Sequence, residues 1–192
     1  LLYGFYHFMT SANPEEQAAF FADNTQGYSL EGIPVLDIDS ESIKDWGNYA
    51  QRFVDKYHAI TGVYPVVYCS AGYLSRFNGY PLVDTCGLWV AGYPDSRERG
   101  LNDVPKFPYD VSPWKFAAMW QYTSNGYVSW WDEPVDLDVA WMDVGAWKLY
   151  ANPNADLCDS TIKLPTAAPA PDKDGKGWHF ENGMVEVDVR LK

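Results

Sequence analysis

The stretch Ile33-Pro34-Val35-Leu36-Asp37-Ile38-Asp39-Ser40-Glu41 is apolar at first and then carries a carboxylate at every second position. In a β-strand, residues two apart lie on the same face, about 6.5–7 Å from each other. Asp37 and Asp39 therefore share a face if the strand runs through both, and Glu41 joins them if it continues. An apolar strand that ends in acids is typical of a buried sheet or barrel strand with carboxylates at its mouth.

Two carboxylates in unequal environments are the minimal apparatus for hydrolysing a glycosidic bond. The alternative for this segment is a strand end whose acids are simply solvated before a helix begins. This segment alone is consistent with both interpretations, and evidence from the rest of the sequence is needed to choose between them.

The composition fits one domain with a tail and limits the partners of the chain. Of its 192 residues 47% are hydrophobic, which is enough for a core. A formal net charge of −12 argues against nucleic acid and anionic lipid, because both are bound through Lys and Arg. No run of about 18 apolar residues indicates membrane insertion. Aromatic residues reach 17%, which suits either stacking on sugar rings or an aromatic-rich core.

The order of the predicted strands and helices differs between the two halves of the chain. Strands are expected at 1–8, from Ile33 onward, and at 63–70, 87–93, 115–122 and 135–142. A long loop is expected over 94–113 and a turn at Ser124-Asn125-Gly126. Helices are expected from Asn13, which can act as N-cap, and from Ser42 to Gly62, with a helical turn at 72–77. The early alternation of strands and helices indicates parallel strands, and the later strands follow one another directly.

Polar or aromatic side chains lie near the late end of nearly every predicted strand. They are His7, Asp37, Asp39, Tyr68, Ser70, Tyr93, Gln121 and Tyr122. Barrels of parallel strands build their active sites at this end, so the repetition favours a functional site over solvated acids. A single histidine at a strand end is more often hydrogen-bonded than catalytic, and this applies to His7.

Several segments along residues 1–143 resemble, in order, the motifs of the glycoside hydrolase family 25 lysozymes, the Chalaropsis-type N-acetylmuramidases of bacteria and phages. The segments are Gly4-Phe5-Tyr6-His7-Phe8, Pro34-Val35-Leu36-Asp37-Ile38-Asp39, Val67-Tyr68-Cys69-Ser70, Leu88-Trp89-Val90-Ala91-Gly92-Tyr93, Trp120-Gln121-Tyr122-Thr123-Ser124-Asn125-Gly126 and Val135-Asp136-Leu137-Asp138. The family's corresponding patterns are G-x-Y-H-F, P-x-L-D-x-E, I-Y-T-S, L-W-x-A-x-Y, W-Q-Y-T-x-x-G and V-D-L-N.

The resemblance implies an α/β fold, a modified TIM-like (β/α)5β3 barrel. Only three strand–helix units precede the final three strands here, so we expect the domain to lack its first two units, including a D-x-S strand. The exposed sheet edges of such a domain would favour association, whereas the complete domain is expected to be a monomer. We expect the domain at 1–150, a Pro/Ala-rich linker at 151–177 and a β-hairpin at 178–192, which can begin a cell-wall-binding module.

The resemblance also implies the activity: cleavage of the β-1,4 bond between N-acetylmuramic acid and N-acetylglucosamine in peptidoglycan, with retention of configuration. Asp39 takes the position of the family's general-acid Glu, and Asp37 that of the group that stabilises the intermediate. The substrate-binding residues are then expected to be Tyr6, Tyr68, Trp89, Tyr93, Gln121, Tyr122 and Asp136. No cofactor is expected, and the protein would act outside the cell or at the cell wall.

Two alternatives depart from this prediction. Asp39 is one methylene shorter than Glu, which withdraws the proton by roughly 1.5 Å, so the chain could be an inactive carbohydrate-binding relic. The second alternative is a metal-dependent hydrolase that uses His7, Asp37 and Asp39. These residues do not have the sequence spacing that is typical of metal ligands. The three cysteines, Cys69, Cys86 and Cys158, do not have a metal-ligand spacing either. Because their number is odd, at least one of them is not in a disulfide within the chain.

Overall fold

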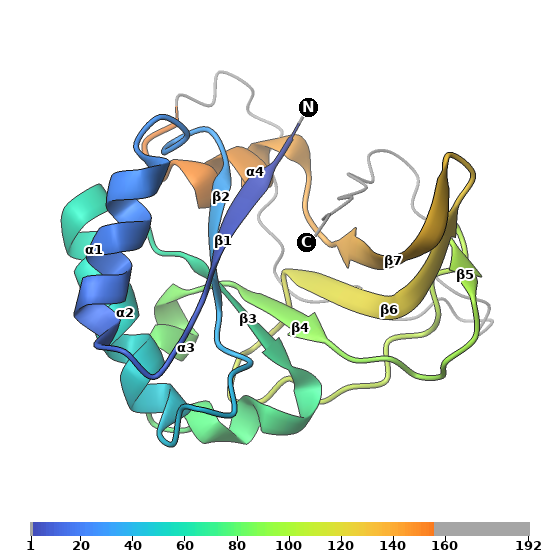
Figure 1. Cartoon of the computed structure of the whole chain (residues 1–192), viewed down its shortest axis with the longest axis horizontal. Coiled ribbons are helices and arrows are strands. Elements are labelled where there is room, and N and C mark those ends of the chain that lie inside the picture. The colour runs from blue at the N-terminus through green and yellow to red at the C-terminus, as the bar shows by residue number, and fades with distance from the viewer. Residues whose placement is uncertain (1, 156–192) are drawn as a thin grey trace.

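The computed structural model describes residues 2–155 of the chain. The predicted hairpin at 178–192, Cys158 and almost all of the predicted linker at 151–177 lie outside these residues. The elements in chain order are β1 Gly4–Phe8, α1 Pro14–Thr25, β2 Ile33–Asp37, α2 Trp46–Thr61, β3 Val66–Ser70, η1 Ala71–Phe77, α3 Leu82–Thr85, β4 Leu88–Ala91, β5 Arg99–Gly100, β6 Met119–Val128, β7 Trp131–Ala140 and α4 Val144–Ala151 (Figure 1).

The strands form one mostly parallel sheet. Strands β1, β2, β3, β4 and β6 lie side by side in this order and are parallel, while β7 pairs antiparallel with β6 and the short β5 pairs parallel with it. Within the described residues β1 pairs only with β2, and β7 only with β6, so these two strands end the sheet. The expected α/β class with an early parallel half is therefore confirmed, as is the succession of strands at the end.

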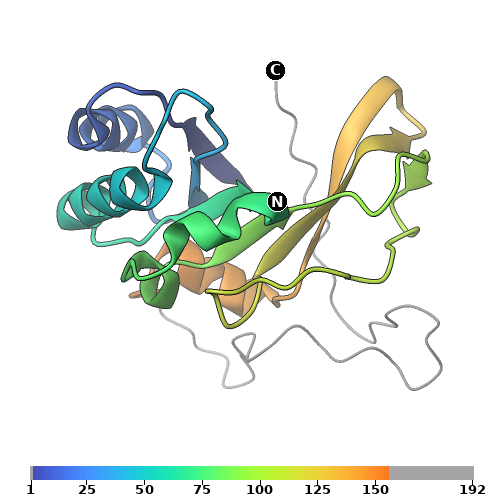
Figure 2. The same ribbon diagram turned by 90° about the horizontal axis from the view of Figure 1, so that it is seen from below.

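Side-chain alternation gives the sheet two faces, which we call outer and inner. On the outer face Leu36 of β2, Val67 of β3 and Val90 of β4 join the large core cluster with helices α1 and α2. Figure 2 shows these two helices side by side at one end of the molecule and the β6–β7 hairpin at the other. On the inner face Val35, Val66 and Trp89 pack in a second cluster with α4. Residues of opposite parity in one strand therefore cannot serve the same site.

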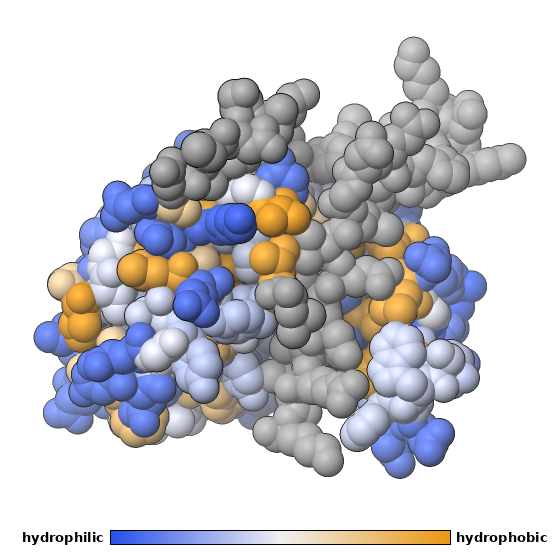
Figure 3. All heavy atoms as spheres, turned by 90° about the horizontal axis from the view of Figure 1, so that it is seen from above, coloured by the Kyte–Doolittle hydropathy of each residue, from blue (hydrophilic) through white to orange (hydrophobic). Residues whose placement is uncertain are grey.

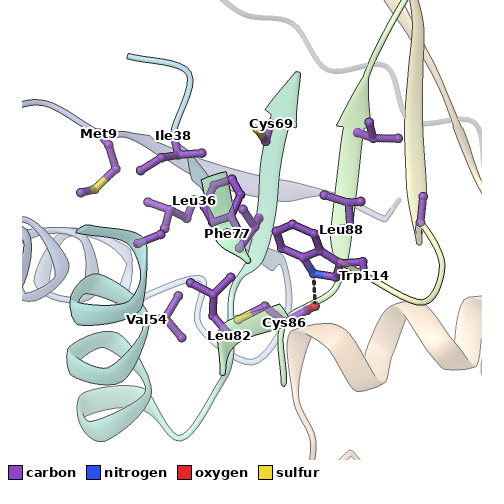
Figure 4. Close-up of a cluster of buried hydrophobic side chains, with 14 of the residues drawn as sticks. Met9, Leu36, Ile38, Val54, Cys69, Phe77, Leu82, Cys86, Leu88 and Trp114 are labelled. Atoms are coloured by element: carbon purple, nitrogen blue, oxygen red, sulfur yellow. Dashed lines mark hydrogen bonds between the residues drawn. The ribbon is translucent and has the colours of Figure 1, made fainter. Parts of the chain in front are cut away.

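The close-up of the outer core shows how the predicted strands and helices meet. Leu36, Val54, Phe77 and Trp114 converge there from β2, α2, η1 and the loop before β6 (Figure 4). The Trp114 indole Nε1 donates a hydrogen bond of 3.1 Å to the carbonyl oxygen of Cys86, so this buried polar group is satisfied. Cys69 and Cys86 are both buried as free thiols in this core.

The helix ends follow their capping residues. Asn13 caps α1 as predicted, since its side chain accepts a hydrogen bond of 3.0 Å from the Glu16 amide. The expected start of α2 at Ser42 was wrong: Asp45 is the N-cap and accepts from the Asn48 amide at 3.1 Å. Helix α2 ends at Gly62, whose φ of 75° is the left-handed conformation that glycine adopts readily.

The second half of the chain departs from the predicted boundaries. The predicted turn at Ser124-Asn125-Gly126 lies inside strand β6, where shifts in the register with β7 absorb its irregular backbone. Helix α4 was not predicted, although Asp143 caps it by accepting from the Ala146 amide at 2.7 Å. Packing of α4 on the inner face covers the early ends of the strands, and the late ends remain open for a site.

The molecular surface mixes apolar and polar side chains. Figure 3 shows patches of hydrophobic side chains among hydrophilic ones on one face of the molecule. None of the helices within residues 2–155 has the length and apolar character needed to cross a membrane.

Gly47 of α2 packs tightly against Arg76 and Tyr80, and its replacement by Ala is expected to destabilise the fold. A Cβ there would lie 2.1 Å from the ring of Tyr80 and 2.8 Å from the carbonyl oxygen of Arg76. Overpacking of this kind costs about 1–3 kcal/mol, which exceeds the gain of about 1 kcal/mol from helix propensity. Urea denaturation should therefore show a lower free energy of unfolding for Gly47→Ala. Gly72→Ala is the control, since nothing lies within 4 Å of its Cβ; equal losses in both variants would contradict this packing.

Candidate active site

The acidic strand end forms a compact unit, but not by strand alternation alone. Strand β2 stops at Asp37, and the Asp39 amide turns back to donate a hydrogen bond of 3.1 Å to the Asp37 carboxylate. Asp37 lies on the inner face, because Leu36 and Ile38 fill the outer core. Glu41 is exposed beyond the strand, so the condition for its sharing the face of Asp37 is not met. Asp37 and Asp39 are brought together as predicted, through the backbone of the turn.

Ser70 holds the second carboxylate in place. As the last residue of β3, it donates from its amide to Oδ1 of Asp39 at 3.1 Å. Its hydroxyl donates a hydrogen bond to Oδ2 of the same carboxylate. Both oxygens of Asp39 are thus fixed against the neighbouring strand. This pairing ties together the late ends of β2 and β3, at the edge where the sequence predicted a site.

The two carboxylates occupy unequal environments, as an acid and a charge-stabilising group require. Burial raises the pKa of Asp37 to about 6; the hydrogen bond from the Asp39 amide opposes the rise, and the nearby Asp39 charge adds to it. Asp39 lines an open cavity of about 790 Å³ together with Glu41. Asp39 therefore borders the cavity, whereas Asp37 is not part of its lining.

A network of two phenols and one amide extends the site across the inner face. Gln121 is buried, and its side-chain oxygen accepts hydrogen bonds from Tyr68 at 2.8 Å and from Tyr93 at 2.6 Å. Burial raises the pKa of Tyr68, and Tyr93, Asp37 and Asp39 add to the rise. The three residues come from β3, from the end of β4 and from β6, so predictions made on separate segments meet in one place.

Asp138 is a site residue that the sequence analysis did not select. The Trp89 indole nitrogen donates a hydrogen bond of 2.8 Å to its carboxylate, and both side chains are buried. Trp89 also packs edge-to-face against Tyr68, with ring centroids 5.1 Å apart. The selected residue of β7, Asp136, is half-buried, and burial raises its pKa. Since Asp136 and Asp138 lie two apart in one strand, alternation could have indicated that both share the inner face.

Two of the candidates, Tyr122 and His7, lie on the outer face of the sheet, and Tyr6 lies exposed on strand β1. Tyr122 faces the outer core, where it is 1% exposed and its hydroxyl donates to the Leu101 carbonyl at 3.3 Å. His7 also faces outward and stacks on Phe53, with ring centroids 5.4 Å apart. Tyr6 lies on the opposite side of β1 from His7, beside Val35 of the inner face, and is 40% exposed. Tyr122 and His7 are thus separated from Asp37 by the sheet.

The placement of His7 argues against the predicted metal alternative. Its Nε2 lies 3.1 Å from the side-chain oxygen of Gln17, and burial lowers its pKa. It cannot join Asp37 and Asp39 as a ligand from the outer face of the sheet. Within residues 2–155 no set of three or more His, Cys, Asp or Glu side chains is arranged to hold a metal ion.

The sequence matches a known enzyme family and a curated relative. The profile of Glycosyl hydrolases family 25 matches residues 1–131. The N,O-diacetylmuramidase of Chalaropsis sp is 36% identical over 143 residues, which cover 65% of this chain. The chain spans 62% of the length of that curated relative.

Solved structures show the same fold. The muramidase from Acremonium alcalophilum is 26% identical with a TM-score of 0.57, over 79% of this chain and 73% of that one. The lysozyme from Streptomyces coelicolor has a TM-score of 0.61 at 24% identity, over 79% and 73% of the two chains, which is a likeness of fold. Because the family profile covers more than half of the sequence and the fold agrees with it, the chain belongs to glycosyl hydrolases family 25.

Proposed function

We propose that this chain is a peptidoglycan hydrolase, a muramidase that cleaves the β-1,4 bond between N-acetylmuramic acid and N-acetylglucosamine. The observation that carries the proposal is the pair Asp37 and Asp39 at the late end of β2. One carboxylate is buried with a raised pKa, and the other lines an open cavity. Membership of family 25 and the muramidase relative support the same substrate class.

The positions of the two carboxylates suggest their roles. Asp39 borders the cavity, where it would protonate the oxygen of the leaving sugar. Asp37 lies next to it and would stabilise the positive charge of an oxazoline-like intermediate formed with the substrate's acetamido group. The configuration at the anomeric carbon would then be retained. Ser70 positions Asp39: its amide donates to Oδ1, and its hydroxyl, which can also accept, would take the hydrogen bond from Oδ2 when Asp39 carries the proton.

The remaining inner-face residues would bind the sugars. Tyr68 and Tyr93 donate to Gln121, so their oxygens keep lone pairs that can accept from sugar hydroxyls. Trp89 and Asp136 would line the same groove, and Tyr6 would lie at its margin. We leave Tyr122 out of this set because its side chain lies in the outer core.

The sheet itself fits the later part of the family's barrel. Strands β1 and β7 end the described sheet, and two further strand–helix units between them would complete a (β/α)5β3 barrel. The finding that the chain spans 62% of its curated relative supports this completion. The protein would act outside the cell or on the wall, where its substrate is.

Digestion of purified cell walls tests the proposal. The 192-residue chain is incubated with walls, with and without a chelator, and new reducing ends are measured. Release that the chelator leaves unchanged is expected. Sedimentation with the walls without release of reducing ends would instead indicate a binding protein, and loss of release on chelation would indicate a metal-dependent hydrolase.

The pH profile should report the ionisation of Asp37. Its proposed role requires the charged form, and its pKa is about 6. The value of kcat/KM is therefore expected to rise as the pH increases through about 6, because Asp37 is protonated below that pH. A soluble muramyl-glucosaminyl oligomer is a suitable substrate, at constant ionic strength. A fall of the rate through the same range that is present in the parent chain and absent from Asp37→Asn would make Asp37 the proton donor and reverse the roles.

A further inference from the structure

The cavity beside Asp39 contains charged side chains that the proposed chemistry does not use. It lies between the loop that follows β2 and helix η1, and its volume is about 790 Å³. Cavities of about 300–1,000 Å³ accommodate small-molecule ligands. Since Asp39 is part of the wall, a group bound here would be attached to the sugar next to the cleaved bond.

Arg76 of η1 is held in this cavity by two aromatic rings. Its guanidinium carbon lies 4.2 Å from the centroid of the Trp46 ring and 4.4 Å from that of Tyr73. Trp46 is 3% exposed, and its indole nitrogen donates to the Ile43 carbonyl at 2.9 Å, so this ring is fixed. Stacking restrains the guanidinium through its flat faces and leaves its N–H edge available.

Within residues 2–155 the Arg76 guanidinium forms no salt bridge and no hydrogen bond with another residue. Asp45, which also lines the cavity, accepts on its Oδ1 from both the Asn48 amide and the Tyr80 hydroxyl and forms no salt bridge with Arg76 within the described residues. Arg76 therefore offers a planar fork of donors that matches a carboxylate.

Two more charges line the cavity, one of each sign. Lys44 and Glu41 are both exposed and lie in the loop after β2. The cavity wall carries two cations, Arg76 and Lys44, and three carboxylates, Asp39, Glu41 and Asp45, and this mixture suits a ligand that carries both signs of charge. A short peptide with carboxylates and an amine has this character, and a neutral sugar does not.

We propose that this cavity binds the peptide that peptidoglycan carries on its muramic acid, with Arg76 pairing one of the peptide carboxylates. The proposal rests on the proposed function, because it assigns a second part of the same substrate. It makes Arg76 a specificity-determining residue, so that glycan bearing peptides is preferred over glycan without them.

Binding measurements on the whole chain test the proposal directly. The probes are an N-acetylmuramyl peptide with free carboxylates, the same compound with its carboxylates amidated, and an N-acetylglucosamine oligosaccharide. Arg76→Gln is expected to weaken binding of the free peptide at least about tenfold, the effect of losing a charge-assisted pair. Binding of the amidated peptide and of the oligosaccharide should stay unchanged, and Arg76→Lys should fall between Gln and the parent.

Arg97→Gln is the matched control, because Arg97 is also exposed but already pairs with Asp95 and Asp103. Its affinities should equal those of the parent chain. Unchanged binding of the free peptide in Arg76→Gln would overturn the proposal. Equal weakening of all three probes would also overturn it, since Arg76 would then act by supporting the fold. Failure of the parent chain to bind the free peptide would do the same.

Hydrolysis separates this proposal from the proposed function. Peptide-bearing glycan and glycan stripped by an amidase are digested by the parent chain and by Arg76→Gln. A preference for the peptide-bearing form that disappears in the variant supports both proposals. Equal rates on both substrates in both chains would refute the peptide site alone. Peptide binding that depends on Arg76, without any hydrolysis, would refute the hydrolase alone.

Discussion

Asp37→Asn is expected to lose wall hydrolysis by about 100- to 1,000-fold while gaining stability at neutral pH. The loss follows because the neutral amide cannot stabilise the positive intermediate. The gain follows because burial raises the pKa of Asp37 from 3.8 to about 6. Between these values the folded state binds more protons than the unfolded state, so the Asp37 contribution to stability falls as the pH rises.

The difference in stability between Asp37→Asn and the parent chain can be measured at two pH values. Above about pH 6 the buried charge costs up to about 3 kcal/mol, at about 1.4 kcal/mol per pKa unit, and Asn removes this cost. Below about pH 4 the side chain is protonated in both states, and the variant should match the parent. Denaturant unfolding at pH 8 and at pH 3.5 measures both. Asp84→Asn, an exposed acid paired with Lys115, is the control and should change neither property.

Opposite movements of activity and stability would distinguish a catalytic role from simple damage to the fold. A variant with full activity would remove Asp37 from the mechanism. A variant less stable than the parent at pH 8 would show that the carboxylate is better solvated than its burial indicates.

Substitutions of Asp39 are expected to have the second large effect on wall hydrolysis. If it delivers the proton, Asp39→Asn should lose activity by about 100- to 10,000-fold. Asp39→Glu should instead raise the rate on peptidoglycan by up to about 100-fold, because the extra methylene returns the proton to the family's position. The open cavity in front of Asp39 gives the longer side chain room. Reducing-end release from walls measures all the variants.

Glu41→Gln provides the matched comparison, because Glu41 lines the same cavity. Its loss of activity should be far smaller than that of Asp39→Asn, because Glu41 would meet the substrate only through the peptide. If Asp39→Glu leaves the rate unchanged or lower while Glu41→Gln abolishes it, then Glu41 is the acid and the role given to Asp39 is wrong.

Alternation explains which parts of the site could be predicted from the sequence. The apolar residues of β2 and β3 fix the faces of these strands, so Asp37 and Tyr68 could be expected on one side. The same rule places Gln121 and Tyr122 on opposite faces, and selecting both for one groove neglected it. Asp138 was missed for the same reason, although its spacing from Asp136 indicated a shared face.

Other features depend on contacts between distant segments. The pairing of Asp39 with Ser70 joins residues 31 positions apart and sets where β2 gives way to a turn. Helix α4 is short, contains Gly145 and is stabilised by packing on the inner face, so its local pattern was weak. The predicted turn at Ser124-Asn125-Gly126 was overridden by pairing with β7.

The identity of the new reducing end tests the central claim most directly. Purified walls are digested with the 192-residue chain, the soluble fragments are reduced with borohydride, and mass spectrometry identifies the reduced sugar. A muramidase leaves N-acetylmuramic acid at the reducing end, and Asp37→Asn should release almost none. Fragments that end in reduced N-acetylglucosamine, or undigested walls with the chain bound to them, would contradict the account.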